Sequence, residues 1–509
     1  MGNDYPNSRL YLCNVPFSKD YEHTIDFPNF TTQFDYFVSV SSKSYQNFSY
    51  IRETGTIQVD EYKESILNNN YLIFWNNDKW YFAFIDSIEY INNSCSEIFF
   101  TIDVFQTYLF NFRFVSCFVE REHVSDDTIG LHTIPENLET GEYITNYVNQ
   151  EPSITLSYKI VIASTISLGE SLTPDGGGLY NRIYSGVSYY AYDNQDEVNQ
   201  VLKRVAEAGK SDAINSIFLV PSKFITSIES NKKISNSNSS VVFNWNNLTK
   251  PSNLAGYTPK NNKLFTYPYC YINASNHVGS NTVYRYEDFS TSNINFDIEG
   301  AITPGMSIKL IPKNYKNKET NYIEGLNLGK FPICSWQTDV YTNWLTQNSV
   351  NIETKTLENL VNTGLNTLTS SNVQGITSSL VSGYFNIRNI MNEKYIHSLQ
   401  PPQSNGNLNS GDVTFSSYNM SFILYHMCIK PEYSKIIDDY FSMYGYQVND
   451  VKVPNVNTRP NWNYLKTTGT TVRANIPQNH LDTLNSIFNK GITIWHSPSV
   501  IYNYNLNNK

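Results

Sequence analysis

The first part of the chain alternates short runs of apolar and aromatic residues with turn-forming residues. The runs YLIFW (71–75) and KWYFAFI (79–85) are separated only by Asn76, Asn77 and Asp78, which predicts a β-hairpin. Two more runs, 97–110 and 112–124, are strand-like, and the second places Phe112 and Phe114 on one face. We therefore predict an N-terminal β domain over residues 1–146.

The pattern changes after residue 146. The apolar run 159–164 and the run 217–224 predict strands, while 196–209 has the period of an amphipathic helix that ends at Gly209. This combination predicts an α+β insertion over 147–235, at the outer side or tip of the molecule. Short apolar runs with strand character return in residues 236–340, which predicts a second β domain.

Residues 337–396 form the main predicted helical block. It contains the longest stretch without a charged side chain, 29 residues from Asn359 to Ile387. Because only 16% of the residues are charged, chance gives roughly even odds of one such stretch. The prediction therefore rests on apolar residues that recur at helical steps of three and four, namely Leu357, Leu360, Val361, Leu365, Leu368, Val373, Ile376, Leu380, Val381, Tyr384, Phe385 and Ile387.

Three interpretations of this block stay open on residues alone. It could be a helical hairpin packed in a core or subunit interface, a membrane-active element, or a flexible linker, and its glycines would permit close helix packing. An ordinary transmembrane helix is disfavoured because Ser, Thr, Asn and Gly interrupt the stretch. Pro401 and Pro402 end the block, and residues 403–509 read as a mixed C-terminal domain.

Composition supports a β-rich protein of roughly two to four domains. The 509 residues include 39 Tyr and 28 Phe, which favour strands. The net charge of −10 argues against a general nucleic-acid binder, although it suits a conduit that DNA passes without sticking. The N-terminal residues lack an apolar stretch, so no signal peptide is expected. The scattered cysteines predict free buried thiols and assembly in a reducing cytoplasm: Cys13, Cys95, Cys117, Cys270, Cys334 and Cys428.

The sequence contains few motifs that are typical of catalytic or metal-binding sites. The sequence contains none of the common zinc-protease, phosphate-loop or hydrolase motifs. His426 and Cys428 form a His-x-Cys step, which is more typical of two buried strand residues than of a metal site. REHV (121–124) favours an ion-pair cluster at a strand end over a catalytic group. We therefore expect no enzyme and no catalytic, cofactor-binding or metal-binding residues.

Several segments, in order along the chain, resemble one known family. They are CNVPFSKDY (13–21), KWYFAFI (79–85), TIDVFQTYLFNFRF (101–114), FVEREHV (118–124), LFTYPYC (264–270), YGYQVNDVKVPNVNTRPNWNYLKT (444–467) and IFNKGITIWH (487–496). This set is similar to the tail knob, or distal tail tube, proteins of the small short-tailed phages of Gram-positive bacteria, the picovirus type.

The resemblance implies a homohexameric ring of β-barrel-like or sandwich-like domains that forms a DNA-conducting tube. It implies that residues 341–402 form a plug that leaves the tube and enters the host membrane during genome ejection. Amphipathic helices can be soluble inside a tube and membrane-seeking once released, and six copies could satisfy each other's polar groups in lipid. The implied partners are other copies, other tail proteins (the upper tail or collar and the tail-tip enzyme), the host membrane and passing double-stranded DNA without sequence-specific binding.

Together these points predict a mainly β fold with an α+β insertion and a helical loop. The predicted function is a structural, non-enzymatic virion tail protein that is assembled in the host cytoplasm. The alternative is a receptor-binding or cell-wall-degrading tail protein, for which a repetitive fibre or a recognisable catalytic set would be expected.

Overall fold

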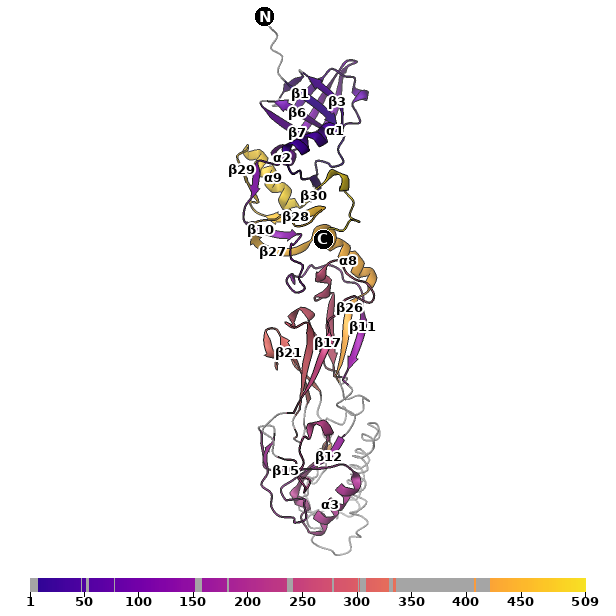
Figure 1. Ribbon diagram of the computed structural model, residues 1–509, viewed down its shortest axis with the longest axis vertical. Coiled ribbons are helices and arrows are strands. Elements are labelled where there is room, and N and C mark those ends of the chain that lie inside the picture. The colour runs from indigo at the N-terminus through magenta and orange to yellow at the C-terminus, as the bar shows by residue number, and fades with distance from the viewer. Residues whose placement is uncertain are drawn as a thin grey trace, which may run out of the picture. The chain divides into compact units, whose positions relative to one another are not determined.

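A computed structural model describes residues 8–335, 407, 408 and 422–509, apart from short gaps at 47, 52–54, 77, 152–157, 181–182, 236–240, 277–278, 301, 303–307 and 329–332. The fold is mainly β with a few helices, as predicted (Figure 1). The chain divides into two compact units. Unit 1 comprises residues 1–141, 257–264 and 431–509, and unit 2 comprises residues 142–256 and 265–430. The five predicted domains and the hexameric ring stay predictions.

Unit 1 begins with a seven-stranded sheet in the order β3-β1-β6-β7-β8-β5-β4. Its strands are β1 (Arg9–Cys13), β3 (Ser41–Gln46), β4 (Ser49–Ile51), β5 (Thr56–Val59), β6 (Tyr71–Asn76), β7 (Lys79–Asn92) and β8 (Cys95–Ile102). The predicted hairpin is confirmed because β6 and β7 pair antiparallel, with Asp78 in the left-handed conformation at φ 56°. Leu12, Leu72 and Ile98 contribute to the core on one face of the sheet.

Two helices complete this part of unit 1. Asn29 caps α1 (Phe30–Ser39) by accepting a hydrogen bond from the Thr32 amide, and Asp103 caps α2 (Val104–Tyr108) through the Gln106 amide. The prediction of one strand over 97–110 is therefore wrong after Ile102, where the Asp103 cap starts a helix whose five residues are all buried.

The rest of unit 1 is a five-stranded sheet in the order β2-β30-β28-β10-β27 and a two-stranded β29-β9 pair. The strands are β2 (His23–Ile25), β9 (Phe112–Phe114), β10 (Cys117–Glu122), β27 (Tyr446–Lys452), β28 (Trp462–Thr468), β29 (Val472–Ala474) and β30 (Ile492–Trp495). The predicted strand 112–124 is wrong as one element, since β9 and β10 join different sheets. Unit 1 also contains helices α8 (Pro431–Tyr444) and α9 (Gln478–Lys490), and Trp462 and Trp495 are fully buried.

Unit 2 contains two antiparallel sheets in the orders β11-β26-β18-β19 and β17-β20-β21-β22, with β23 beside β21. The strands are β11 (Tyr143–Gln150), β17 (Val241–Thr249), β18 (Cys270–Ser275), β19 (Asn281–Tyr284), β20 (Asn293–Gly300), β21 (Ile308–Tyr315), β22 (Lys318–Thr320), β23 (Leu326–Leu328) and β26 (Ile423–Ile429). The apolar run that starts at Leu264 becomes a strand only at Cys270, whose amide donates to the Thr266 carbonyl to close a turn.

Unit 2 also holds the predicted insertion. Its sheet has the order β15-β12-β16-β24-β25, formed by β12 (Tyr158–Ser164), β15 (Ser188–Tyr192), β16 (Ile214–Pro221), β24 (Ile333–Ser335) and β25 (Asn407–Leu408). A separate two-stranded sheet, β13 (Gly178–Tyr180) with β14 (Ile183–Ser185), lies between β12 and β15 in the sequence. Helix α3 (Gln195–Glu207) confirms the predicted amphipathic helix. It buries Val198, Leu202 and Val205, and the chain turns at Gly209, where φ is 67°.

Short 3₁₀ helices complete the described elements at Lys63–Ser65, Ser211–Ala213, Ser222–Phe224, Asn262–Phe265, Tyr286–Asp288 and Pro498–Val500. Within the described part of the chain, no helix combines the length and apolar character needed to cross a bilayer.

Candidate functional site: a buried polar network and pocket in unit 1

A buried three-charge cluster lies beside the end of β10. The Glu136 carboxylate forms ion pairs with the Arg121 guanidinium and the Lys263 ammonium, and it also accepts a hydrogen bond of 2.9 Å from the Gln447 amide. The Glu136 side chain is fully buried, while those of Lys263 and Arg121 are 3% and 11% exposed. Burial at this level makes each charge depend on its partners.

Aromatic rings and backbone carbonyls complete the surroundings of the two cations. The Arg121 guanidinium lies 5.0 Å from the Tyr440 ring centroid and donates to the Gly445 carbonyl at 2.8 Å. The Lys263 ammonium lies 5.2 Å from the Tyr446 ring centroid. Within REHV, the predicted ion-pair cluster is thus confirmed for Arg121.

Asp438 is the second buried acid of the network. Its carboxylate accepts hydrogen bonds from the Tyr257 hydroxyl at 2.8 Å, the Lys260 amide at 2.7 Å, and the backbone and side-chain amides of Asn261 at 2.9 and 2.8 Å. Since residues 257–264 belong to unit 1 but are flanked in sequence by unit 2, Asp438 fixes this isolated segment to α8.

His123 is held as a neutral imidazole. Its Nδ1 accepts from the Tyr464 amide at 2.8 Å, so Nε2 carries the hydrogen and donates to the Ser442 carbonyl at 3.1 Å. Burial lowers the pKa of His123 to about 3, and the nearby positive charges of Arg459 and Arg121 also lower it. With both ring nitrogens occupied, His123 serves as a structural support.

Gly445 lets helix α8 end against the backbone of β10. It has φ 66°, and its amide donates to the Phe441 carbonyl at 2.9 Å to close the helix. A Cβ atom here would lie 2.1 Å from the Glu122 carbonyl oxygen. Only glycine accommodates both the left-handed conformation and this close approach.

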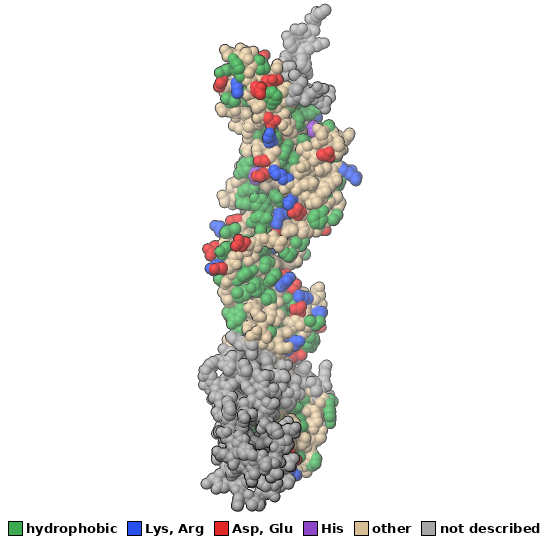
Figure 2. Space-filling model, turned by 180° about the vertical axis from the view of Figure 1, so that it is seen from behind, with side chains coloured by type: hydrophobic (Ala, Val, Ile, Leu, Met, Phe, Trp, Pro, Cys, Tyr) green, Lys and Arg blue, Asp and Glu red, His purple; other side chains and the backbone are tan. Residues whose placement is uncertain are grey.

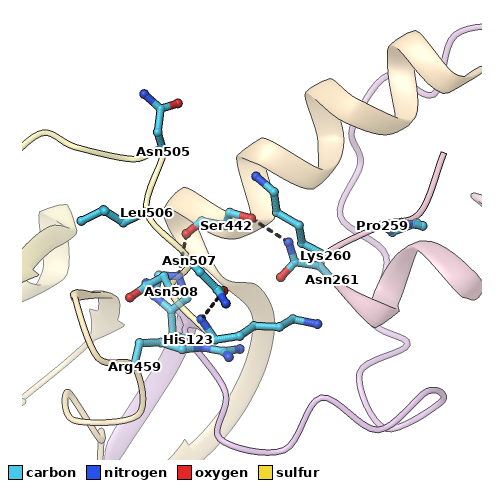
Figure 3. Close-up of a pocket in the computed structure, with 11 residues that line it drawn as sticks. His123, Pro259, Lys260, Asn261, Ser442, Arg459, Asn505, Leu506, Asn507 and Asn508 are labelled. Atoms are coloured by element: carbon cyan, nitrogen blue, oxygen red, sulfur yellow. Dashed lines mark hydrogen bonds between the residues drawn. The ribbon is translucent and has the colours of Figure 1, made fainter.

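A pocket of about 420 Å³ opens next to this network (Figure 3). Its lining comes from five separate segments of unit 1: His123, residues 259–261, Ser442, Arg459, and residues 505–509. Asn508 fixes the last segment, because it accepts from the Asn461 and Trp462 amides and donates to the Trp462 carbonyl.

The residues predicted to form the membrane-active loop, from Leu357 to Ile387, all lie outside the described residues. His426 and Cys428 are buried strand residues of β26, as predicted. His426 is hydrogen-bonded to Tyr286 and Asn149, and burial lowers its pKa to about 4. The described residues contain no group of His, Cys, Asp and Glu side chains suited to hold a metal ion.

The sequence interpretation missed Glu136, Lys263, Asp438 and Arg459. Their partners are far away in sequence, so spacing could not pair them. Asp438 did carry a signal, because it shares the buried face of α8 with Ile437 and Phe441. An acid on an apolar helix face indicates a buried partner.

Comparison with known proteins assigns the family. The profile of the C-terminal domain of the Bacillus phage phi29 tail knob protein gp9 matches residues 228–509, more than half of the chain. The chain belongs to the tail knob protein family. A second profile, the N-terminus of the caudoviral major tail protein, matches residues 7–113 and so covers the seven-stranded sheet.

Tail knob relatives span nearly the full length. The tail knob proteins gp9 of Bacillus phages PZA and B103 are each 25% identical, and that of phage phi29 is 23% identical, over 98% of this chain and 98% of the relative. The solved tail knob protein gp12 of bacteriophage C1 shares the fold, with a TM-score of 0.64 and 15% identity over 99% of both chains. As a tail knob protein, this chain is a structural component of the virion tail. The C-terminal profile includes the pocket residues Lys260, Arg459 and Lys509, whereas His123 and Glu136 lie between the two matched regions.

Proposed function

We propose that the protein assembles as a homohexamer into the distal tube of the tail, conducts the genome during ejection and has no enzymatic role. The observation that carries this proposal is the similarity to tail knob proteins over 98% of both chains. The mainly β units support it, since β-rich domains can form the wall of a ring.

The charge distribution supports passage of DNA without retention. The net charge is −10, and on the face drawn in Figure 2 acidic and basic side chains of the described residues are interspersed. Tight non-specific DNA binding requires many cations aligned with phosphates, and a mixed acidic surface disfavours it.

We further propose that residues 341–402 form the releasable plug that penetrates the host membrane. In sequence the segment lies between β24 and β25, two strands of unit 2. The uncharged stretch 359–387 with its helical apolar period is the chemical basis for membrane entry.

Dye release from liposomes, measured across pH, tests the plug. Intact protein should release dye and a deletion of residues 345–400 should not. Leu380→Asp, on the apolar period, should reduce release, whereas the matched control Ser379→Asp, one position away, should retain most of it. Equal leakage by intact and deleted protein would refute the membrane role.

Light scattering coupled to size-exclusion chromatography tests the tube separately. A mass of six chains is expected for the intact protein. A monomer or trimer at assembly concentrations would contradict the hexamer, whatever the liposome result.

A further inference from the structure

The pocket beside His123 is lined by positive side chains without an acidic one. Lys260, Arg459 and Lys509 all line it, and the remaining lining side chains are neutral: His123, Pro259, Asn261, Ser442, Asn505, Leu506, Asn507 and Asn508. His123 adds no charge, because both its nitrogens are engaged and its pKa is lowered to about 3. In a protein of net charge −10, this is a local concentration of positive charge.

Arg459 is the cation of this pocket whose guanidinium has an unsatisfied hydrogen-bond donor among the described residues. Its guanidinium forms no ion pair with any residue that the structure describes, and its Nε is buried without a hydrogen-bond partner. A buried guanidinium nitrogen normally donates to an oxygen, and an unsatisfied one is costly. The Nε–H donor of Arg459 is therefore available for an oxygen atom that the described residues do not supply.

The other two cations each lie near an aspartate. Lys260 Nζ lies 3.5 Å from an Asp439 oxygen, and the side chains are 57% and 43% exposed. That exposed pair contributes little, so Lys260 can turn toward a bound anion at small cost. Lys509 Nζ lies 3.2 Å from an oxygen of Asp127, and these side chains are 40% and 14% exposed, so Lys509 contributes its charge from its present position.

The walls of the pocket are fixed in advance. Asn261 donates to the Ser442 hydroxyl at 2.8 Å (Figure 3) and is anchored by Asp438. Asn508 holds residues 505–509 against β28 by donating to the Trp462 carbonyl. A site with positioned walls loses less entropy when a small ligand binds.

We propose that this pocket binds a small oxyanion of the phosphate class, with Arg459 as the main ligand and Lys260 and Lys509 as supporting charges. A guanidinium offers paired N–H donors that match two oxygens of one phosphoryl group. Three cations around one cavity suit a multiply charged anion better than a single carboxylate. The volume of about 420 Å³ admits a phosphate with a small substituent, such as a sugar or glycerol unit. This inference does not depend on the proposed plug or on the proposed hexameric tube.

Isothermal titration of the full chain at constant ionic strength tests the site, with chloride as the reference anion. One arm uses inorganic phosphate and the other a glycerol phosphodiester, because the phosphoryl group could be free or part of a polymer. Saturable binding of one anion per chain in either arm supports the proposal, and the tighter arm identifies the source.

Two variants and a matched control locate the binding. Arg459→Gln should weaken it at least about ten-fold, as expected for loss of a charge-assisted pair. Arg473→Gln removes the same charge from an exposed position on β29 and should leave binding unchanged. Lys260→Gln alters only an exposed side chain, so it tests the site even if Arg459→Gln perturbs folding. No saturable binding, or equal binding by the wild type and both pocket variants, would overturn the proposal.

Discussion

Replacement of Glu136 by Gln should strongly destabilise unit 1. The substitution keeps the shape of the side chain and removes the negative charge that forms ion pairs with Arg121 and Lys263. These cations are 11% and 3% exposed, so water cannot replace the lost partner. Breaking a buried ion pair on one side costs about 3–5 kcal/mol.

The contacts that remain reduce this cost only in part. The Tyr440 and Tyr446 rings keep their cation–π contacts, and the Gly445 carbonyl still accepts from Arg121. We therefore expect a loss of about 4 kcal/mol, which is roughly a thousand-fold in the folding equilibrium constant.

Urea unfolding read by hydrogen exchange in peptides of β10 and α8 measures this loss in unit 1 alone. The matched control is Glu120→Gln, which breaks a half-exposed pair with Lys466 and should cost less than about 1 kcal/mol. Glu136→Gln combined with Lys263→Met should recover part of the lost free energy of unfolding, because the double variant no longer buries the unpaired Lys263 charge.

The destabilisation should also depend on pH with a definite sign. Burial lowers the pKa of Lys263, and Glu136 opposes that shift. Without Glu136 the folded-state pKa falls further below its unfolded value. The variant should therefore regain stability as the pH rises toward 10.5, as Lys263 loses its proton. A loss below about 1 kcal/mol, or no alkaline recovery, would refute this account of the cluster.

Three more predictions use the same exchange-monitored unfolding. Asp438→Ala leaves four hydrogen-bond donors without their acceptor and should lower the free energy of unfolding by roughly 3 kcal/mol or more. The control Asp439→Ala, which breaks an exposed pair, should lower it by less than about 0.5 kcal/mol. Similar losses in the two variants would contradict the role of Asp438. Gly445→Ala should cost about 2 kcal/mol or more because its Cβ meets the β10 backbone, while Gly469→Ala, with open space around it, should cost about 1 kcal/mol. Burial raises the pKa of Asp103 to about 6, so the stabilisation by its protonated carboxyl is present below pH 4 and is lost as the pH rises through 6. The free energy of unfolding should fall by roughly 3 kcal/mol over this range. Asp103→Asn should remove this pH dependence, and an unchanged pH dependence in the variant would contradict the assignment to Asp103.

The elements that the sequence predicted correctly depend on neighbouring residues. Helix α3 carries its own apolar face, Asn194 cap and Gly209 stop, so its pattern needs no distant partner. The strand over 97–110 was mispredicted although a local signal existed, since Asp103 and Gln106 have the spacing of a helix cap.

The site could be predicted only in part because its residues meet across long sequence separations. REHV identified Arg121 as a member of an ion cluster, but Glu136, Lys263 and Gln447 reach it through the tertiary fold. Arg459 was recognised only as part of a family-like segment, since its lack of a partner becomes visible only once the surrounding side chains are placed.

The order of the strands of unit 1 along the chain determines when each of them can pair during synthesis. The seven-stranded sheet uses residues 9–102 and can form while the ribosome is still translating unit 2. In contrast, β2 must wait for its parallel partner β30, and β10 for β27 and β28. Chains that stop early therefore leave β2 and β10 without partners and cannot present a finished unit 1.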